Sequence, residues 1–263
     1  MVELSADKKD KTFHEVDSAL ERLKSEKRLK GVEDRRVASE VFDKRTLEVL
    51  YKLSNTGYLA ILDGVISTGK EANVFKGLDD NDNFVAVKIY RIATSDFRKM
   101  QYYIQGDPRF KVKMSNKRQI VHTWVNKEFR NLKRAYENGV RVPKPFVSRE
   151  NILIMEFIGD IEGNPAPTLR EAPPLYPEEM FNKIIYYMRL LYREARLVHG
   201  DLSAFNILNF DEEPVIIDIS QAVVVDHPIA GELLERDIRN ISRDFKRFGV
   251  SSTPQEIREK IID

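Results

Sequence analysis

Apolar residues at helical spacing open the chain. Between residues 12 and 29 they recur every three or four positions, which predicts a polar helix with one apolar stripe made of Phe13, Val16, Leu20 and Leu23. A second helical stretch ends near the turn signal at residues 54–57 and carries Val37, Val41, Leu47 and Leu50. We expect residues 1–45 to form a helical extension packed on the main body.

From residue 58 the pattern changes to short runs of β-branched and apolar residues. Three such runs predict consecutive antiparallel strands, namely YLAILDGVIS from residue 58, ANVFKG from residue 72 and FVAVKIY from residue 84. Residues 91–118 lose clear periodicity, which predicts a long, partly ordered insertion. A helix at about 119–137 and two further strands follow, KPFVS from residue 144 and NILIMEF from residue 151.

A connector that contains several Gly and Pro residues separates these strands from a helix expected at 177–196. The connector covers residues 159–174. Three strands, a helix and two strands predict a small mixed lobe over residues 46–158, and residues 159–263 predict a shortened, mostly helical lobe. We therefore expect an α+β fold with two lobes that share a cleft.

Composition narrows the chemistry that is available. The chain has no cysteine and four histidines without the spacing of a helical zinc site, so a metal must be a hard ion held by oxygen. No apolar run approaches the roughly 20 residues that span a bilayer, and the first residues lack the apolar core of a secretory signal. We expect a cytoplasmic protein without membrane partners.

Charge is unevenly distributed along the chain. Residues 88–134 carry thirteen Lys or Arg against three Asp or Glu, although the net charge of the whole chain is only +1. One reading is a solvated loop whose charges serve solubility. The other is a surface for a phosphate-bearing ligand or RNA. The sequence leaves both readings open.

A turn of small residues, STGKEANVF from residue 67, lies between the first two predicted strands. Such a turn lets backbone N–H groups approach phosphate oxygens closely. Gly64 and Gly69-Lys70 also have the spacing of a P-loop. That reading is disfavoured, because Glu71 stands where a P-loop needs a hydroxyl and because a strand is expected to follow instead of a helix.

Lys88 lies in the alternating strand VAVK and should point to the face opposite Val85 and Val87. It is either a solvated surface lysine or the strand lysine that contacts ATP phosphates and pairs with a helix glutamate. Glu128 is the only carboxylate between Asp107 and Glu137, so it is the natural partner.

The strongest signal is VHGDLSAFNIL from residue 198, followed by VIID from residue 215. The spacing D-x-x-x-x-N from Asp201 to Asn206 matches a kinase catalytic loop, in which the aspartate accepts or orients the hydroxyl proton and the asparagine binds a metal. Asp218, twelve residues later, ends an apolar strand and can bridge metal and phosphates. His199 is read as architectural. His227 could be a base, but a hydrogen-bonded loop histidine is the favoured reading.

These segments together resemble the RIO family of atypical serine/threonine kinases, in particular its type-1 branch. The resemblance spans about residues 46–240 and depends most on STGKEANV and IDISQ. It implies a two-lobed protein-kinase-like fold, with Asp201 as catalytic residue and Asn206 and Asp218 as metal ligands. The nucleotide-binding residues that it implies are Ser67, Thr68, Lys70, Lys88, Glu128, Met155, Glu156 and Ile158.

The resemblance also implies ATP and Mg²⁺, with Mn²⁺ able to substitute, and a role in maturation of the small ribosomal subunit, with its RNA and protein as partners. It is compatible with autophosphorylation. In this family the aspartate at the position of Asp218 is described as accepting a phosphoryl group, so an ATPase cycle is a second possibility. The sequence has no A-P-E segment after Asp218, which argues against a general protein-substrate docking lobe.

Two other functions remain as alternatives. HGDLSAFNIL also resembles the catalytic loop of antibiotic phosphotransferases, but these small-molecule kinases generally lack STGKEANV and have a larger second lobe. A nucleotide-gated binding module on a ribosomal precursor is the alternative of a different class, with catalysis secondary and the basic stretch 88–134 on RNA.

Overall fold

The computed structural model describes residues 42–93, 95–110 and 116–263. The helix predicted at 12–29 and all but the last four residues of the predicted extension lie outside these ranges. The end of the second predicted helix is helix α3 (Lys44–Ser54), and the Asp43 side chain caps it by accepting a hydrogen bond from the Thr46 amide at 2.7 Å.

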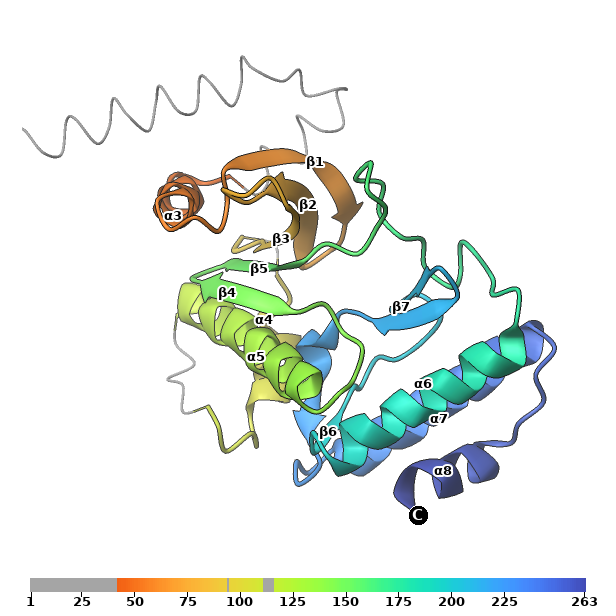
Figure 1. Cartoon of the computed structure of the whole chain (residues 1–263). Coiled ribbons are helices and arrows are strands. Elements are labelled where there is room, and N and C mark those ends of the chain that lie inside the picture. The colour runs from red at the N-terminus through yellow and green to blue at the C-terminus, as the bar shows by residue number, and fades with distance from the viewer. Residues whose placement is uncertain (1–41, 94, 111–115) are drawn as a thin grey trace, which may run out of the picture.

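The predicted strands form one antiparallel sheet in the upper lobe (Figure 1). Its order is β1-β2-β3-β5-β4. The bounds are β1 (Ile61–Thr68), β2 (Ala72–Leu78), β3 (Phe84–Tyr90), β4 (Pro145–Arg149) and β5 (Ile152–Glu156). All five strands therefore lie close to where the sequence predicts them.

Two helices cover opposite faces of this sheet. Helix α3 packs against Val85 and Val87 in one apolar cluster, whereas α5 (Lys117–Glu137) lies on the other face, where Leu153 joins the cluster of Trp124. Strand β3 is buried on both faces, which explains its nearly continuous apolar run. Lys88 points to the α5 face, opposite Val85 and Val87, as the alternation predicts.

The insertion contains a helix that the sequence pattern does not indicate. Helix α4 (Phe97–Ile104) begins after Asp96, whose side chain accepts from the Lys99 amide at 3.0 Å. It buries Met100, Tyr103 and Ile104, and Tyr103 meets Trp124 of α5 edge to face. Eight residues are too few for a clear periodic signal, and the helix is stabilised mainly by packing on α5.

The second lobe combines three helices with short strand pairs. The helices are α6 (Pro177–Arg193), α7 (Ala230–Arg247) and α8 (Pro254–Ile262), and a 3₁₀ turn η1 covers Ile219–Gln221. Strand β6 (Leu197–Val198) pairs with β9 (Val223–Val224), and β7 (Ile207–Phe210) pairs with β8 (Glu213–Ile216). Helix α6 ends three residues before the predicted boundary. No helix among the described residues is long and apolar enough to cross a bilayer.

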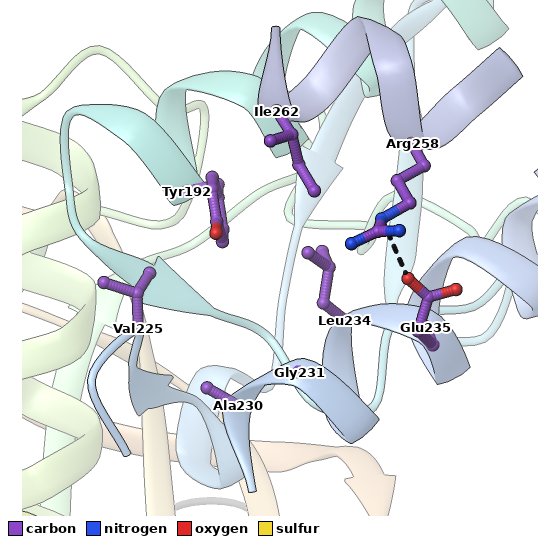
Figure 2. Close-up of a pocket in the computed structure, with 8 residues that line it drawn as sticks. All are labelled: Tyr192, Val225, Ala230, Gly231, Leu234, Glu235, Arg258 and Ile262. Atoms are coloured by element: carbon purple, nitrogen blue, oxygen red, sulfur yellow. Dashed lines mark ion pairs between the residues drawn. The ribbon is translucent and has the colours of Figure 1, made fainter. Parts of the chain in front are cut away.

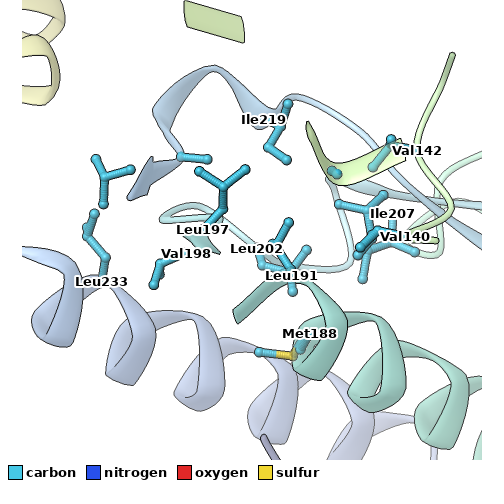
Figure 3. Close-up of a cluster of buried hydrophobic side chains, with 14 of the residues drawn as sticks. Val140, Val142, Met188, Leu191, Leu197, Val198, Leu202, Ile207, Ile219 and Leu233 are labelled. Carbon is cyan, nitrogen blue, oxygen red and sulfur yellow. The ribbon is translucent and has the colours of Figure 1, made fainter. Parts of the chain in front are cut away.

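A buried apolar cluster joins these pieces and continues into the upper lobe (Figure 3). Leu202, near the start of the predicted catalytic loop, and Ile207, just after its end, pack with Leu191 of α6 and Leu233 of α7. The connector at 159–174 has no helix or strand, but the amide of Leu169 donates to the Ile207 carbonyl at 2.8 Å. The catalytic loop is thus held by core residues at both ends.

Replacing Met100 with Ala tests whether α4 is part of the folded body. Met100 is completely buried, so Met100→Ala should lower the free energy of unfolding by about 2–5 kcal/mol. Arg98→Ala, an exposed position on the same helix, should stay within about 0.5 kcal/mol of the parent. Urea unfolding followed by circular dichroism measures both. Equal stability of the two variants would mean that α4 does not pack as described.

Candidate active site

The turn STGKEANVF forms the tip of the β1–β2 hairpin. The Gly69 amide donates to the Ala72 carbonyl at 2.9 Å, and a Cβ on Gly69 would lie only 3.0 Å from that oxygen. Ser67, Thr68 and Lys70 are exposed at this tip. Strand β2 follows the turn, so the P-loop reading is wrong, because a P-loop requires a helix there.

Three of the predicted residues meet in one ion cluster, which is buried at Lys88 and Glu128 and open at Asp218, whose side chain is 43% exposed. The Lys88 ammonium donates to Glu128 Oε1 at 2.8 Å and to Asp218 Oδ1 at 2.9 Å. Only 8% of Lys88 and 1% of Glu128 is exposed. The three side chains come from β3, α5 and the segment after β8. The ion pair suggested by the sequence is present, and the reading of Lys88 as a solvated surface lysine is wrong.

The charges in this cluster stabilise one another. Burial would lower the pKa of Lys88, but Asp218 and Glu128 outweigh burial and raise that pKa above its usual value. Burial would raise the pKa of Asp218, yet the Lys88 ammonium and a hydrogen bond from Ser220 lower it to about 2. For Glu128, burial dominates and raises the pKa, and Lys88 offsets only part of the effect. At neutral pH Asp218 is therefore a carboxylate facing an ammonium.

The predicted catalytic loop is held by hydrogen bonds to its backbone. His199 Nε2 contacts the Ile217 carbonyl at 3.0 Å, and His199 Nδ1 accepts from the Asp201 amide at 3.2 Å. His199 therefore links the catalytic loop to the segment before Asp218, in keeping with an architectural role.

Two buried carboxylates of α7 were missed by the sequence analysis. Asp237 accepts from the amides of Gly200 and Leu202 at 2.7 and 2.9 Å, and Asp244 accepts from the Ala204 amide at 3.0 Å. The signal was present, because both aspartates lie among the apolar positions of an amphipathic helix. Burial raises the pKa of Asp237 to about 6.

Asn206 and Asp218 are brought together by the backbone. The Ile217 amide donates to the Asn206 carbonyl at 3.0 Å, and Asn206 Nδ2 donates to the Asp201 carbonyl at 2.8 Å. Among the described residues, no hydrogen bond occupies Asn206 Oδ1 or Asp218 Oδ2, so both oxygens are available to coordinate a metal. Asp218 also has a left-handed backbone, with φ of 55°, which L-residues adopt at a cost and which is frequent at functional sites.

These two oxygens fit the metal implied by the sequence resemblance. Among the described residues there is no cluster of three or more His, Cys, Asp and Glu suited to a metal. Mg²⁺ bound with a nucleotide does not require one, because phosphates and water supply most of its octahedral ligands. An amide oxygen and a carboxylate oxygen are the hard donors that such an ion prefers.

The predicted hinge follows β5. The Glu156 carboxylate accepts two bonds from Arg141, at 2.8 and 2.9 Å, so a nucleotide contact of Glu156 would come from its backbone. The Ile158 carbonyl accepts from the Ala166 amide at 2.9 Å, and the Ile158 amide donates to no backbone carbonyl of the described residues. Met155 is partly buried against the main core. The roles of these residues toward a nucleotide stay predictions.

His227 is also tied into the fold. It is buried, and its Nε2 contacts the Gln105 carbonyl at 2.7 Å. Burial lowers the pKa of His227, so the ring is neutral at pH 7. These contacts support the structural reading of His227.

Several charges of the basic stretch are used inside the protein. Besides Lys88, the Lys127 ammonium donates to the Ser220 carbonyl at 3.0 Å, and Arg109 pairs with Asp107 at 2.7 Å. Arg118 pairs with Asp43 at 3.0 Å. Lys127 and Arg109 therefore do not belong to a solvated loop, whereas the pair of Arg118 and Asp43 lies at the surface.

A cavity of about 520 Å³ lies between α6, α7 and α8 (Figure 2). Tyr192, Leu234 and Ile262 line it, together with the ion pair of Arg258 and Glu235 at 3.2 Å. None of the predicted site residues borders it.

The fold and the arrangement of the loop place the chain in the class of protein-kinase-like folds. The family model of the RIO domain matches residues 73–257. The chain is 46% identical over 252 residues to the RIO-type serine/threonine-protein kinase Rio1 of Methanocaldococcus jannaschii, covering 96% of this chain and 86% of the relative. It is 43% identical over 258 residues to the Rio1 kinase of Haloferax volcanii, covering 98% and 88%.

A solved structure agrees with the fold. The ADP/Mg²⁺-phosphoaspartate complex of the Rio2 kinase from Chaetomium thermophilum matches with a TM-score of 0.64 and 24% identity, over 82% of this chain and 66% of that one. The chain belongs to the RIO family, and its relatives identify it as a serine/threonine-protein kinase of the type-1 branch. The two-lobed kinase-like fold expected from the sequence is confirmed.

The raised pKa of Asp237 predicts a pH-dependent stability. An unfolded aspartate, with a pKa near 3.8, loses its proton before folded Asp237 does. Protonated Asp237 therefore contributes fully to the free energy of unfolding below about pH 4. This contribution is lost as the pH rises through about 6, by up to about 3 kcal/mol. The difference in unfolding free energy between the parent and Asp237→Asn should change by that order between pH 4 and pH 7 in urea titrations. Asp80→Asn, at an exposed position, is the control. Parallel pH curves for the parent and Asp237→Asn would contradict this account.

Proposed function

We propose that this protein binds ATP with Mg²⁺ and transfers the γ-phosphoryl group to a serine or threonine hydroxyl. The observation that supports this most strongly is the Lys88, Glu128 and Asp218 cluster beside a catalytic loop whose backbone is held at Gly200, Leu202 and Ala204. Phosphoryl transfer depends mainly on positioning and on neutralising charge, and both are favoured by a rigid, charged site of this kind.

Each residue then has a defined part in the transfer. Asp201 accepts the proton of the attacking hydroxyl, whose oxygen forms a bond to the γ-phosphorus as the bond to the ADP oxygen breaks. Lys88 contacts the α- and β-phosphates, and Glu128 holds Lys88 in place. The exposed tip with Ser67, Thr68 and Lys70 covers the phosphates. The backbone after Met155, at Glu156 and Ile158, receives the adenine.

Asn206 and Asp218 would hold the metal through their oxygens. Bound Mg²⁺ would supply neutralisation of the phosphate charge, and Mn²⁺ could take its place. With Asp218 Oδ1 engaged by Lys88 and Ser220, Oδ2 is the oxygen that remains for this contact.

A second route is supported by the state of Asp218. Because its pKa is lowered to about 2, its carboxylate is ionised and can act as a nucleophile at neutral pH. Asp218 would attack the γ-phosphorus, ADP would leave, and water would hydrolyse the acyl phosphate to restore the carboxylate. The net reaction is ATP hydrolysis. The phosphoaspartate named for the Rio2 kinase of Chaetomium thermophilum makes this route worth testing.

The cellular setting that we propose is maturation of the small ribosomal subunit in the cytoplasm. This rests on the family resemblance alone. Phosphorylation of the chain itself fits the same chemistry. Basic residues outside the ion pairs, such as the exposed Arg98, would make the contacts to RNA phosphates.

Turnover of radiolabelled ATP tests the catalytic assignment. Asp201→Ala and Asp218→Ala should each lower the rate of phosphate release and of protein labelling by about 100-fold or more, because each removes a group that acts on the reacting atoms. Asp226→Ala, an aspartate whose side chain is 79% exposed, should leave both rates unchanged. Unchanged turnover in both active-site variants would refute the mechanism. A label that is released by hydroxylamine indicates the acyl phosphate of the second route, whereas a stable label indicates a phosphoester.

Co-sedimentation with small-subunit particles tests the cellular setting. Binding should weaken as the salt concentration rises, because counterions compete for the phosphates, and should differ with and without ATP. Arg98→Ala should reduce the salt dependence. Binding that ignores both salt and nucleotide would contradict the proposal.

A further inference from the structure

Gln221 faces the predicted catalytic aspartate directly. Its Nε2 donates a hydrogen bond to Asp201 Oδ2 at 2.8 Å, and only 7% of Gln221 is exposed. A carboxylate accepts hydrogen bonds and donates none, so the amide must present its nitrogen. Among the described residues, Oδ1 of Asp201 has no hydrogen-bond donor. One oxygen of Asp201 is therefore occupied by the protein, and the other is left to face a substrate.

The paired strands β6 and β9 set this contact. Val198 lies opposite Val223, and Leu197 lies opposite Val224. Asp201 comes three residues after Val198, and Gln221 comes two residues before Val223. The register thus brings both side chains to the same end of a two-stranded sheet that is buried in the main core.

Helix α5 holds the backbone on both sides of Gln221. Lys127 donates to the carbonyls of Ser220 and Ala222, the residues just before and just after Gln221. Asn131 Nδ2 donates to the same Ala222 carbonyl at 3.0 Å. Lys127 and Asn131 are completely buried. A buried lysine needs such acceptors, so the two carbonyls and the Lys127 side-chain nitrogen hold each other in place.

A carboxylate without this partner could turn about its last bond and present either oxygen. A hydroxyl that must lose its proton during an in-line attack needs one acceptor oxygen at a fixed place. The amide also differs from a lysine or arginine at this position, because it orients the carboxylate without adding a charge.

We propose that Gln221 is a positioning residue for catalysis, which holds Asp201 Oδ2 and so directs Oδ1 toward the acceptor hydroxyl. This inference rests on the proposed function and deepens it, because it adds a residue that acts through Asp201 and does not touch the nucleotide. It also gives the α5 contacts a role in the alignment of the acceptor.

Two substitutions of similar length separate the parts of this proposal. Gln221→Met keeps the volume but removes the donor, so kcat should fall by about 10- to 100-fold while KM for ATP stays within about twofold. Gln221→Glu places a second carboxylate against Asp201. Since two carboxylates at this distance resist ionising together, the acidic limb of the pH dependence of kcat should move up by about one pH unit or more.

Gln255 supplies the matched control. Its Nε2 donates to Glu259 Oε1 at 2.8 Å in the exposed part of α8, so it makes the same kind of bond away from the site. Gln255→Met and Gln255→Glu should leave kcat, KM and the pH dependence as in the parent. Thermal unfolding of all four variants shows which of them fold.

The possible results separate a failure of the positioning role from a failure of the proposed function. If both Gln221 variants keep the kcat and pH dependence of the parent while Asp201→Ala loses turnover, the positioning role is wrong and the proposed function stands. If Asp201→Ala itself retains turnover, the proposed function fails first. If Gln221→Met does not fold, the pH dependence of the near-isosteric Gln221→Glu decides, and an unshifted acidic limb overturns the inference.

Discussion

The rest of the site depends on the burial of one ammonium group. Lys88 lies inside the protein between Glu128 and Asp218, and a buried charge is tolerated only when paired and hydrogen-bonded. The three groups belong to the sheet, to α5 and to the segment that follows β8. Forming the ion cluster therefore brings the sheet and α5 to the second lobe at a defined distance. Removing Lys88 would leave two neighbouring carboxylates without their shared counter-charge, and breaking a buried ion pair in this way typically costs about 3–5 kcal/mol.

Helix α5 carries the contacts from which this arrangement is built. Two adjacent residues of α5 contact neighbouring parts of the segment after β8. Glu128 binds Lys88, which in turn binds Asp218, and Lys127 donates to the carbonyls on both sides of Gln221. A shift of α5 would change the surroundings of Asp218 and of Asp201 together. The insertion adds to this, because Arg109 contacts Asn131 on the same helix at 2.9 Å. The basic stretch that suggested an external partner is thus partly an internal framework.

Helix α7 holds the backbone of the catalytic loop from the side opposite α5. Its aspartates accept backbone amides on alternate residues from Gly200 to Ala204, so the loop is held through its backbone while its side chains stay available. A loop rigid in this way loses little conformational freedom when a substrate arrives. The exposed Phe205 follows the last of these contacts, at the point where the chain turns toward Asn206.

Much of this protein follows from the order of residues alone. The five strands, α5 and α6 follow from periodicity, and the motif spacing singles out Lys88, Glu128, Asp201, Asn206 and Asp218, because these signals are local. Helix α4 was missed because eight residues give too short a pattern. The roles of Asp237 and Gln221 were missed because their hydrogen-bond partners are distant in sequence, 35–37 residues away for Asp237 and 20 residues away for Gln221. Only tertiary structure decides which buried polar groups satisfy each other, since any donor in the chain could serve any acceptor until packing chooses between them.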